Sequence, residues 1–417
     1  MAPKRKEDSR GRKHSKSRDR RLSVNRRASV NRRASVGNHR PVQGRSASKM
    51  RTAGGQQSVA RGVQTRHRIG VPRAVAEQTT SNSLIQQQSA AERWFEIIRQ
   101  GGIKRVRQQY VIDHQQYRRP GGTYEAFQRL EREAVKLNRY EDVQLLDQSR
   151  VVLRRAGGPD YVHASHVKGG PFPMICAQGP LDQTIDHFWT MIVENNCAVV
   201  VQLCQNVEDG RTKCANYLPK EKTNFGNVTV TLRDRTKQAS ANPDVRRTVF
   251  DAALKGSKTL TVSQERVTHL QFDGWPDHDV PLDPASFRQL RVSVLGIAQA
   301  TKCTVLIHCS AGVGRTGTYA AIEIAIQNLI QNNHQIQLSS VFRAVRDQRE
   351  RAIQTDLQYL FLHRAVIDAA VEAGRLQEAT AEAFISEYDG LIDRKRKEAV
   401  EVNARFKAEY AKRKGNN

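Results

Sequence analysis

A short apolar run, followed by small residues and then by a helical pattern, most constrains how this chain can fold. Residues 303–308 read Cys-Thr-Val-Leu-Ile-His, and such a β-branched run is typical of a buried strand. Within 319–331, apolar residues recur at i, i+4, i+7 and i+8, which indicates one face of a helix. A strand that passes through a tight loop into a helix favours an α/β domain. We therefore expect a central, highly twisted mixed sheet flanked by helices.

Other segments predict the rest of the domain in outline. Helical spacing runs through 91–133, interrupted by Pro-Gly-Gly at 120–122, and helices dominate 339–374. Residues 394–414 are rich in charge and predict either a helix or a frayed tail. Further strands are predicted at 198–203, 227–232, 259–262 and 267–272.

The charge of the chain is concentrated in its first quarter. The 417 residues carry 68 Lys and Arg against 42 Asp and Glu, a net charge of +26, and residues 1–92 alone carry 22 against five. That segment contains no Phe, Trp, Tyr or Cys, so it cannot bury enough apolar surface to offset the entropy of folding. We expect a disordered basic tail over 1–92, one folded domain over 93–374 and a charged C-terminal extension over 375–417. No apolar stretch is long enough to predict a membrane span.

The predicted tail contains three copies of Arg-Arg-x-Ser-Val, whose serines are Ser23, Ser29 and Ser35. The pattern resembles the site of basophilic kinases of the cyclic-AMP-dependent class, so such a kinase is an expected partner, with an unmodified linker as the alternative. We expect a cytoplasmic protein. Residues 4–6, Lys-Arg-Lys, resemble a nuclear-import cluster, so a nuclear location is the alternative. Nucleic acid would suit the same charges, but the tail has no aromatic side chain to stack on bases, and this partner is not favoured.

The loop between the predicted strand and helix carries the chemistry. Part of it, 312–317, matches the dinucleotide-binding pattern G-x-G-x-x-G, which requires an acidic residue about 20 positions further on. The chain has Gln-Asn-Asn-His at 331–334, so dinucleotide binding is excluded. The same loop also holds Cys309 and Arg315 in a Cys-x5-Arg pattern, which indicates a different ligand.

Five small residues between a cysteine and an arginine are suited to binding a phosphate group. Their backbone N–H groups and the following helix N-terminus can point toward a bound anion, and the planar fork of Arg315 can hold two phosphate oxygens. The same positive field favours an ionised thiol, so Cys309 is predicted to be a thiolate aimed at phosphorus. The five residues are Ser310, Ala311, Gly312, Val313 and Gly314.

The string from His308 to Thr318 resembles the signature of the classical, tyrosine-specific protein phosphatases of the non-receptor type. The resemblance extends from about Trp94 to Gly374, with other family motifs in the family's order. It implies hydrolysis of phosphotyrosine in a protein substrate, without a cofactor. These motifs are the phosphotyrosine-recognition loop at 136–140, core segments at 178–180 and 188–189, the loop with Glu208 and Lys213, the acid loop at 275–281 and the glutamine loop at 354–359.

The resemblance also assigns the reacting groups. Cys309 would attack phosphorus and form a cysteinyl-phosphate. Asp277 would protonate the departing phenolate and then, as a base, activate water. Gln354, together with Gln358, would position that water. Arg315 and the loop amides would stabilise charge on the equatorial oxygens.

Three residues would support the reacting groups from close by. Thr316 would donate a hydrogen bond to the thiolate as it leaves. His308 would order the loop and tune the thiolate. Glu208 would hold Arg315 through a carboxylate–guanidinium pair.

Substrate binding is assigned by the same resemblance. Tyr140 would stack on the substrate ring, and a pocket of that depth would exclude phosphoserine, whose phosphate could not reach Cys309. Asp142 would bind backbone N–H groups of the substrate. Lys213 is expected on the substrate side of the pocket.

Two positions depart from the family pattern. Asp279 stands where Gly is common, two residues after the acid, and would stiffen the loop or raise the pKa of Asp277. His163 stands where Asn is usual. A non-enzymatic phosphotyrosine reader is therefore the alternative to an active enzyme, and a nucleic-acid-associated protein that acts through its tail is a third candidate.

The remaining cysteines predict neither a disulfide framework nor a metal site. They lie in apolar segments and form no C-x-x-C pair, and the histidines lack ligand spacing, so we expect buried thiols and no metal. They are Cys176, Cys197, Cys204, Cys214 and Cys303.

Overall fold

A computed structural model describes the chain over residues 88–119, 121–154, 159–236, 242–255 and 265–415. The predicted strand at 259–262 and the predictions for Ser23, Ser29 and Ser35 lie outside the described residues. In the described part, no helix is both long enough and apolar enough to cross a membrane.

Nine of the described strands form one sheet in the order β1-β2-β3-β11-β4-β10-β9-β8-β7. At the centre of the sheet, β11 pairs in parallel with both β3 and β4, and β4 pairs in parallel with β10. The remaining pairs are antiparallel. The predicted mixed sheet is thus confirmed. The strands are β1 Arg150–Val152, β2 Tyr161–Val167, β3 Met174–Ala177, β4 Val199–Gln202, β7 Lys222–Phe225, β8 Val228–Thr236, β9 Val245–Leu254, β10 Glu265–Phe272 and β11 Val305–His308.

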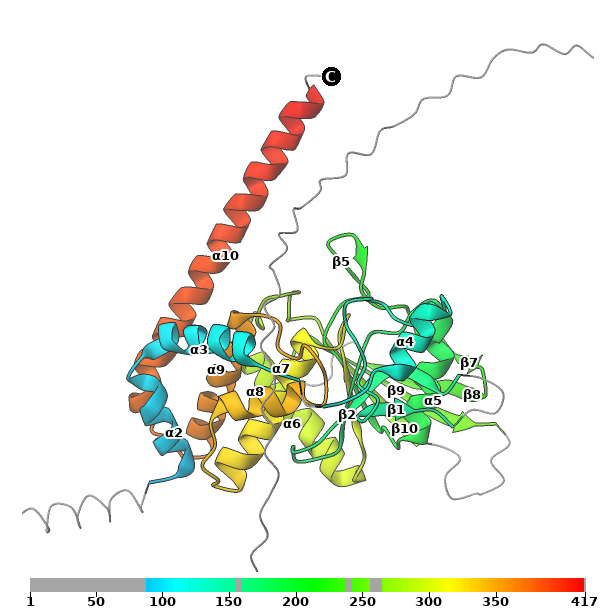
Figure 1. Cartoon of the computed structure of the whole chain (residues 1–417), viewed down its shortest axis with the longest axis horizontal. Coiled ribbons are helices and arrows are strands. Elements are labelled where there is room, and N and C mark those ends of the chain that lie inside the picture. The colour runs from blue at the N-terminus through cyan, green and yellow to red at the C-terminus, as the bar shows by residue number, and fades with distance from the viewer. Residues whose placement is uncertain (1–87, 120, 155–158, 237–241, 256–264, 416–417) are drawn as a thin grey trace, which may run out of the picture. The chain divides into compact units, whose positions relative to one another are not determined.

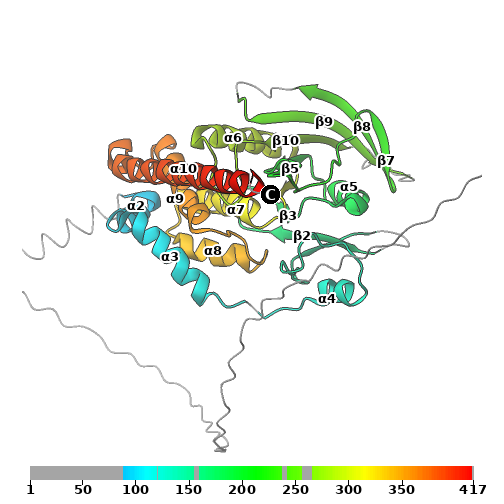
Figure 2. The same ribbon diagram turned by 90° about the horizontal axis from the view of Figure 1, so that it is seen from above.

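Helices cover the sheet on both faces (Figures 1 and 2). Helices α6 to α9, with α2 and α3, gather on one side, and α5 packs against β2, β7, β8 and β9 on the other. A two-stranded hairpin, β5 Val207–Glu208 and β6 Arg211–Thr212, stands apart from the large sheet. The helices are α2 Ala90–Arg99, α3 Gly102–Gln116, α4 Glu125–Arg132, α5 Ile185–Glu194, α6 Pro284–Thr301, α7 Gly314–Ile326, α8 Leu338–Arg346, α9 Asp356–Glu372 and α10 Glu378–Gly415, with short turns η1 Asp182–Thr184 and η2 Gln327–Gln331.

Most predicted elements occur where the patterns placed them, and the differences lie at their ends. Strands β4, β8, β10 and β11 occupy the predicted runs. The helical pattern over 91–133 is divided into α2, α3 and α4, because the chain turns at Gly101 and again before α4. Helix α2 begins at Ala90, where Ser89 and Glu92 form a reciprocal capping box. The C-terminal segment, predicted as a helix or a frayed tail, is the single 38-residue helix α10.

An ion pair inside the core joins α6 to α7. Arg291 donates two hydrogen bonds to the carboxylate of Glu323, each 2.8 Å long, and both side chains are buried. This pair fixes α6 against the helix that follows the Cys-x5-Arg loop.

We expect Glu323→Leu to lower the free energy of unfolding by about 3–5 kcal/mol, because it leaves the buried Arg291 guanidinium unpaired. The double variant Arg291→Met/Glu323→Leu, which removes both charges, should recover most of that loss. Urea unfolding followed by circular dichroism measures both. A single variant as stable as the wild type would contradict a buried ion pair at this position.

Candidate active site

The Cys-x5-Arg loop, residues 309–315, closes the end of β11 and leads into α7. Because β11 is the central parallel strand, the loop emerges from the middle of the sheet. Cys309 is buried at the floor of a cavity of about 480 Å³. Most of the predicted site residues line this cavity, whose lining is Arg139, Tyr140, Asp142, Val143, Arg211, Thr212, Lys213, Asp277, His278, Cys309, Ser310, Ala311, Arg315 and Gln354.

Gly312 lets the loop turn tightly against the neighbouring strand β3. Its φ of +71° lies in the left-handed region, which residues with a side chain rarely adopt. A Cβ at this position would lie 2.1 Å from the carbonyl oxygen of Ala177. The small residue is therefore required by both the backbone conformation and the close approach of β3.

We expect Gly312→Ala to lower kcat/KM for an aryl phosphate at least about tenfold, because the loop must move to relieve the clash with β3. Gly296→Ala is the matched control, since Gly296 lies on α6 and a Cβ there meets nothing within 4 Å. That variant should keep full activity. Equal activity of the two variants would show that the loop does not need Gly312.

Arg315 is held rigidly above the loop by a carboxylate and a backbone carbonyl. Its two terminal nitrogens donate to the two carboxylate oxygens of Glu208 at 2.7 and 2.9 Å, and one of them also donates to the carbonyl of Trp275 at 3.0 Å. Burial disfavours the charged form, but the bonds to Glu208 and the nearby thiol of Cys309 outweigh it. The pKa of Arg315 is thus raised above its usual value, and the guanidinium stays charged.

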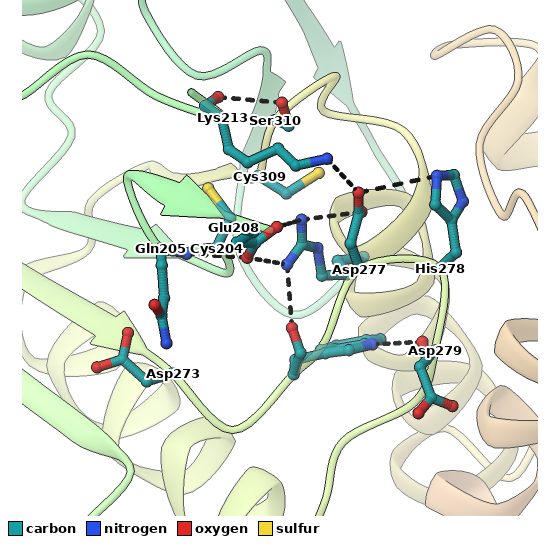
Figure 3. Close-up of polar contacts among 12 residues, drawn as sticks. Cys204, Gln205, Glu208, Lys213, Asp273, Asp277, His278, Asp279, Cys309 and Ser310 are labelled. Carbon is teal, nitrogen blue, oxygen red and sulfur yellow. Dashed lines mark hydrogen bonds and ion pairs between the residues drawn. The ribbon is translucent and has the colours of Figure 1, made fainter. Parts of the chain in front are cut away.

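Asp277 lies over the same cavity and contacts two cations. One carboxylate oxygen accepts from Arg315 at 3.0 Å and the other from Lys213 at 2.5 Å. Figure 3 shows Glu208, Lys213 and Asp277 converging near Cys309. Burial alone would raise the pKa of Asp277, but Lys213, Arg315 and His278 outweigh burial and hold that pKa below its usual value.

We expect Lys213→Met to move the alkaline limb of the kcat/KM profile to higher pH. The reason is that loss of the ammonium removes a group that stabilises the Asp277 carboxylate, so the pKa of Asp277 rises and the protonated acid persists to higher pH. Lys220→Met, at an exposed position outside the cavity lining, should leave the profile unchanged. A limb that stays in place, or moves to lower pH, would contradict control of Asp277 by Lys213.

Side walls of the cavity come from the segment before β1 and from the segment just before α9. The hydroxyl groups of Tyr140 and Ser310 lie 2.8 Å apart, which fixes the ring of Tyr140 beside the loop. Asp142 pairs at 2.8 Å with Arg351, so a substrate backbone would have to compete for its carboxylate. Gln354 lines the cavity, whereas Gln358 is buried behind it and accepts a hydrogen bond from the backbone N–H of Gln354.

The sequence profile of the protein-tyrosine phosphatase family matches residues 134–368, which is more than half of the chain and includes the whole cavity. The chain belongs to this family. The predicted family resemblance is thus confirmed.

Relatives with similar sequences are tyrosine-protein phosphatases. Mouse receptor-type tyrosine-protein phosphatase C is 36% identical over 239 residues, which is 55% of this chain and 18% of the relative. Human tyrosine-protein phosphatase non-receptor type 9 is 32% identical over 303 residues, 64% of this chain and 49% of the relative. The Lar-like tyrosine-protein phosphatase of Caenorhabditis elegans is 34% identical over 253 residues, 58% and 11% of the two chains. The chain therefore spans about half the length of these relatives or less.

Behind the phosphatase loop, His308 belongs to a buried polar network. Its Nε2 lies 2.7 Å from the hydroxyl of Tyr217, which in turn lies 2.9 Å from His269. Burial lowers the pKa of His308 to about 4 and that of His269 to about 3, so both rings are neutral at neutral pH. His308 Nδ1 lies 3.3 Å from the Cys309 carbonyl oxygen. A neutral His308 can order the loop, but it adds no positive charge beside the thiol.

Arg349 is a loop-supporting residue that the sequence patterns did not identify. It is buried, and it donates to the carbonyl oxygens of Ala311 and Gly312, each at 3.0 Å. With these carbonyls held behind the loop, the loop N–H groups are left to face the cavity. Sequence position alone could not separate Arg349 from the nearby Arg346 and Arg351, because its role arises only from tertiary contacts.

His163, a departure from the family pattern, supports the same arginine. Its Nδ1 lies 3.0 Å from Arg349, and its Nε2 lies 2.9 Å from the carbonyl oxygen of Val143. Burial and the charge of Arg349 lower the pKa of His163 to about 3. The neutral ring thus offers one acceptor and one donor, as an asparagine amide would. This departure keeps the contacts of the loop.

The second departure, Asp279, does not act on the acid as its charge suggested. The pKa of Asp277 is lowered rather than raised, and in Figure 3 the side chain of Asp279 points away from Asp277. Its carboxylate lies instead 3.8 Å from Arg396 of α10. Asp279 is also not among the groups that shift the pKa of Asp277, so this expectation is wrong, and the alternative, that Asp279 stiffens the loop, stays a prediction.

Thr316 and the other cysteines of the chain are also buried. Thr316 Oγ1 is buried and makes no hydrogen bond to any described group. All six cysteines are free and buried, and burial raises the pKa of Cys176 and Cys214 to about 12. Among the described residues, no group of three or more His, Cys, Asp or Glu side chains could hold a metal ion.

Proposed function

We propose that this chain hydrolyses phosphotyrosine in proteins through a cysteinyl-phosphate on Cys309. The observation that carries the proposal is the meeting of three groups in one cavity. A buried cysteine lies at the floor, an arginine locked by Glu208 lies beside it, and Asp277 lies over both. Such groups can serve as a nucleophile, a phosphate clamp and a proton donor.

In the first step, the Cys309 sulfur forms a bond to phosphorus while the bond from phosphorus to the phenolic oxygen breaks. Arg315 and the loop N–H groups stabilise the charge on the equatorial oxygens. Asp277 gives its proton to the departing phenolate. A bound phosphate dianion supports this transfer, because its negative charge near Asp277 competes for Arg315 and favours the protonated carboxyl.

In the second step, water attacks the phosphorus of the cysteinyl-phosphate and the sulfur leaves as a thiolate. Asp277, now ionised, accepts the proton of the water. Gln354 lines the cavity and can orient this water, while Gln358 holds the backbone of Gln354 in place. The Thr316 hydroxyl, which is buried without another partner among the described groups, donates to the thiolate.

The depth of the cavity favours phosphotyrosine over phosphoserine. Cys309 is buried at the floor, whereas the Asp142 carboxylate at the rim is largely exposed. Tyr140, fixed by Ser310, forms a wall on which a phenyl ring can stack. A short phosphoserine side chain would not carry its phosphate from the rim to the sulfur.

A pair of peptides that differ only in carrying phosphotyrosine or phosphoserine tests the proposed function. Wild type should release phosphate from the phosphotyrosine peptide, while Cys309→Ser releases none above background. The phosphoserine peptide should remain intact with both proteins. If wild type and Cys309→Ser act alike on phosphotyrosine, the chain binds this group without turning it over, as a phosphotyrosine reader would.

The organisation of the whole chain is proposed from composition. We propose a basic tail over 1–92, a phosphatase domain over 93–374 and a charged extension over 375–417. Within the tail, a basophilic kinase would act on Ser23, Ser29 and Ser35. Mass-spectrometric mapping after treatment with such a kinase should find phosphate on these serines, and labelling elsewhere only would refute the assignment.

Nuclear import through 4–6 is tested by the location of a tail–reporter fusion with and without that cluster.

A further inference from the structure

Helix α10 packs against the phosphatase domain along one face and then leaves it. The buried side chains recur at helical spacing and end one turn before Arg396. Arg396 stands four residues after Ile392, so it continues the same face at the point where the helix passes the acid loop. In Figure 1 the rest of α10 extends beyond the other helices. The buried residues are Ala381, Phe384, Tyr388, Leu391 and Ile392.

Three kinds of contact hold the base of α10 in place. The Glu387 carboxylate accepts from the backbone N–H of Ile103 at 3.2 Å, which caps the N-terminus of α3. Asp389 accepts from Arg364 of α9 at 2.6 Å. Phe384 packs edge-on against a ring of α2, with centroids 6.2 Å apart. The position of Arg396 is therefore set by a docked helix.

Arg396 contacts the acid loop, residues 275–281, at two points and the residue that follows it at a third. Its terminal nitrogens donate to the carbonyl oxygens of Pro281 at 3.0 Å and of Leu282 at 3.4 Å. Its Nε lies 3.8 Å from the carboxylate of Asp279. Both charged side chains are about 30% exposed, at 30% and 28%, so the ion pair is partly shielded from water.

The loop that Arg396 contacts is in the position where its acid faces the cavity. At the other end of the loop, the carbonyl of Trp275 and the carboxylate of Asp277 both accept from Arg315. The Trp275 indole donates to the carbonyl of Asp279 at 2.8 Å, which links the two ends of the loop. The loop is thus held by Arg315 on the cavity side and by Arg396 on the outer side.

We propose that Arg396 of α10 is a positioning residue that stabilises the acid loop with Asp277 over the cavity. The inference rests on the proposed function, since only a loop that delivers an acid gives this contact a kinetic effect. Asp279 is then the loop side of the contact, which accounts for a charged residue where the family commonly has Gly. Through this contact the C-terminal helix contributes to catalysis, and displacement of the helix lowers the rate of acid-dependent hydrolysis.

Two aryl phosphates of different leaving-group acidity test this role. Arg396→Ala should lower kcat/KM for phenyl phosphate, which needs the acid, about three- to tenfold. It should change kcat/KM for 2,4-dinitrophenyl phosphate little, because that phenolate leaves without a proton and kcat/KM does not include the later hydrolysis of the cysteinyl-phosphate, which both esters share. A merely destabilised protein would lose both rates equally. Arg396→Lys, which keeps the charge but not the planar fork, should fall between wild type and Arg396→Ala.

Hydrogen exchange of the acid loop gives a second readout that does not depend on activity. Backbone N–H groups of 275–282 should exchange faster in Arg396→Ala than in wild type, because the loop leaves its docked position more often. Arg394→Ala is the matched control, since Arg394 is an exposed arginine on the same helix. It should match wild type in both rates and in exchange.

The inference and the proposed function fail in different ways. If wild type hydrolyses both esters and Arg396→Ala matches it on phenyl phosphate, or exceeds it, the positioning role is overturned while the phosphatase activity stands. If wild type shows no Cys309-dependent hydrolysis, the proposed function fails. Exchange then decides alone whether Arg396 holds the loop, and unchanged exchange in Arg396→Ala overturns the contact.

Discussion

Asp277→Asn is expected to lower kcat for a phosphotyrosine peptide by about 10²- to 10⁴-fold, because the amide cannot protonate the departing phenolate. The amide keeps the size of the carboxyl group, so it preserves the shape of the cavity. It also lacks the charge that competes with phosphate for Arg315, so KM should not rise. Steady-state kinetics on wild type and variant measure both parameters.

The pH dependence of this variant separates a lost acid from a disturbed loop. The wild-type rate should fall as pH rises, because the pKa of Asp277 is held low and the protonated acid becomes scarce. The fall should be absent in Asp277→Asn. Asp273→Asn, which changes an acid outside the cavity lining, serves as control and should retain the wild-type profile. A profile that still falls in Asp277→Asn would assign the titration to another group.

Arg315→Lys is expected to lower kcat/KM by about 10³-fold or more, although the charge at this position is kept. A lysine cannot form the two parallel bonds with Glu208, bond to the Trp275 carbonyl and still present a planar edge to phosphate. Hydrolysis of a phosphotyrosine peptide measures the loss. Inorganic phosphate, as a competitive inhibitor, should also bind more weakly.

Glu208→Gln is the control that separates the effect of the ion pair with Glu208 from the effect of the Arg315 side chain itself. It should lower kcat/KM less than Arg315→Lys does, because Arg315 keeps its contact with Trp275 and still faces the cavity. A lysine at 315 that retained near-wild-type activity would contradict a bidentate phosphate clamp. It would show that a point charge is sufficient.

The elements that could be predicted are those with a strong local pattern. Strand β11 is a β-branched run, and α7 and η2 show a regular apolar face, so the central strand, loop and helix follow from local physics. Helix α6 was missed although it has a clear start. Asp283 caps its N-terminus and Pro284 occupies the first turn, and the apolar face follows at helical spacing.

The form of α10 could not be decided from its composition. Its Ala, Glu, Lys and Arg content suits a solvated helix and a frayed tail equally well. Five buried side chains and the contacts of Glu387 and Asp389 settle it as a docked helix, and these depend on groups far away in sequence. Tertiary contacts, which no local pattern encodes, determine such an element.

In the candidate site, too, residues in a local motif could be predicted, whereas residues that act through tertiary contacts could not. Cys309 and Arg315 lie in one contiguous string whose spacing indicates phosphate chemistry, and the acid loop carries its own motif. The supporting groups are dispersed, and their roles depend on which side chains the fold brings together. Arg349 holds loop carbonyls from 37 residues away, and Arg396 contacts a loop more than 110 residues earlier in the chain.

Rapid quenching of wild type with a phosphotyrosine peptide tests the central claim, nucleophilic attack by Cys309, most directly. Mass spectrometry of the digested, acid-quenched protein should find one phosphoryl group on the peptide that contains Cys309, in an amount that rises within the first turnover. Cys309→Ser should carry no phosphoryl group and release no phosphate. Phosphate release by wild type without a labelled cysteine, or release by Cys309→Ser at the wild-type rate, would contradict the account.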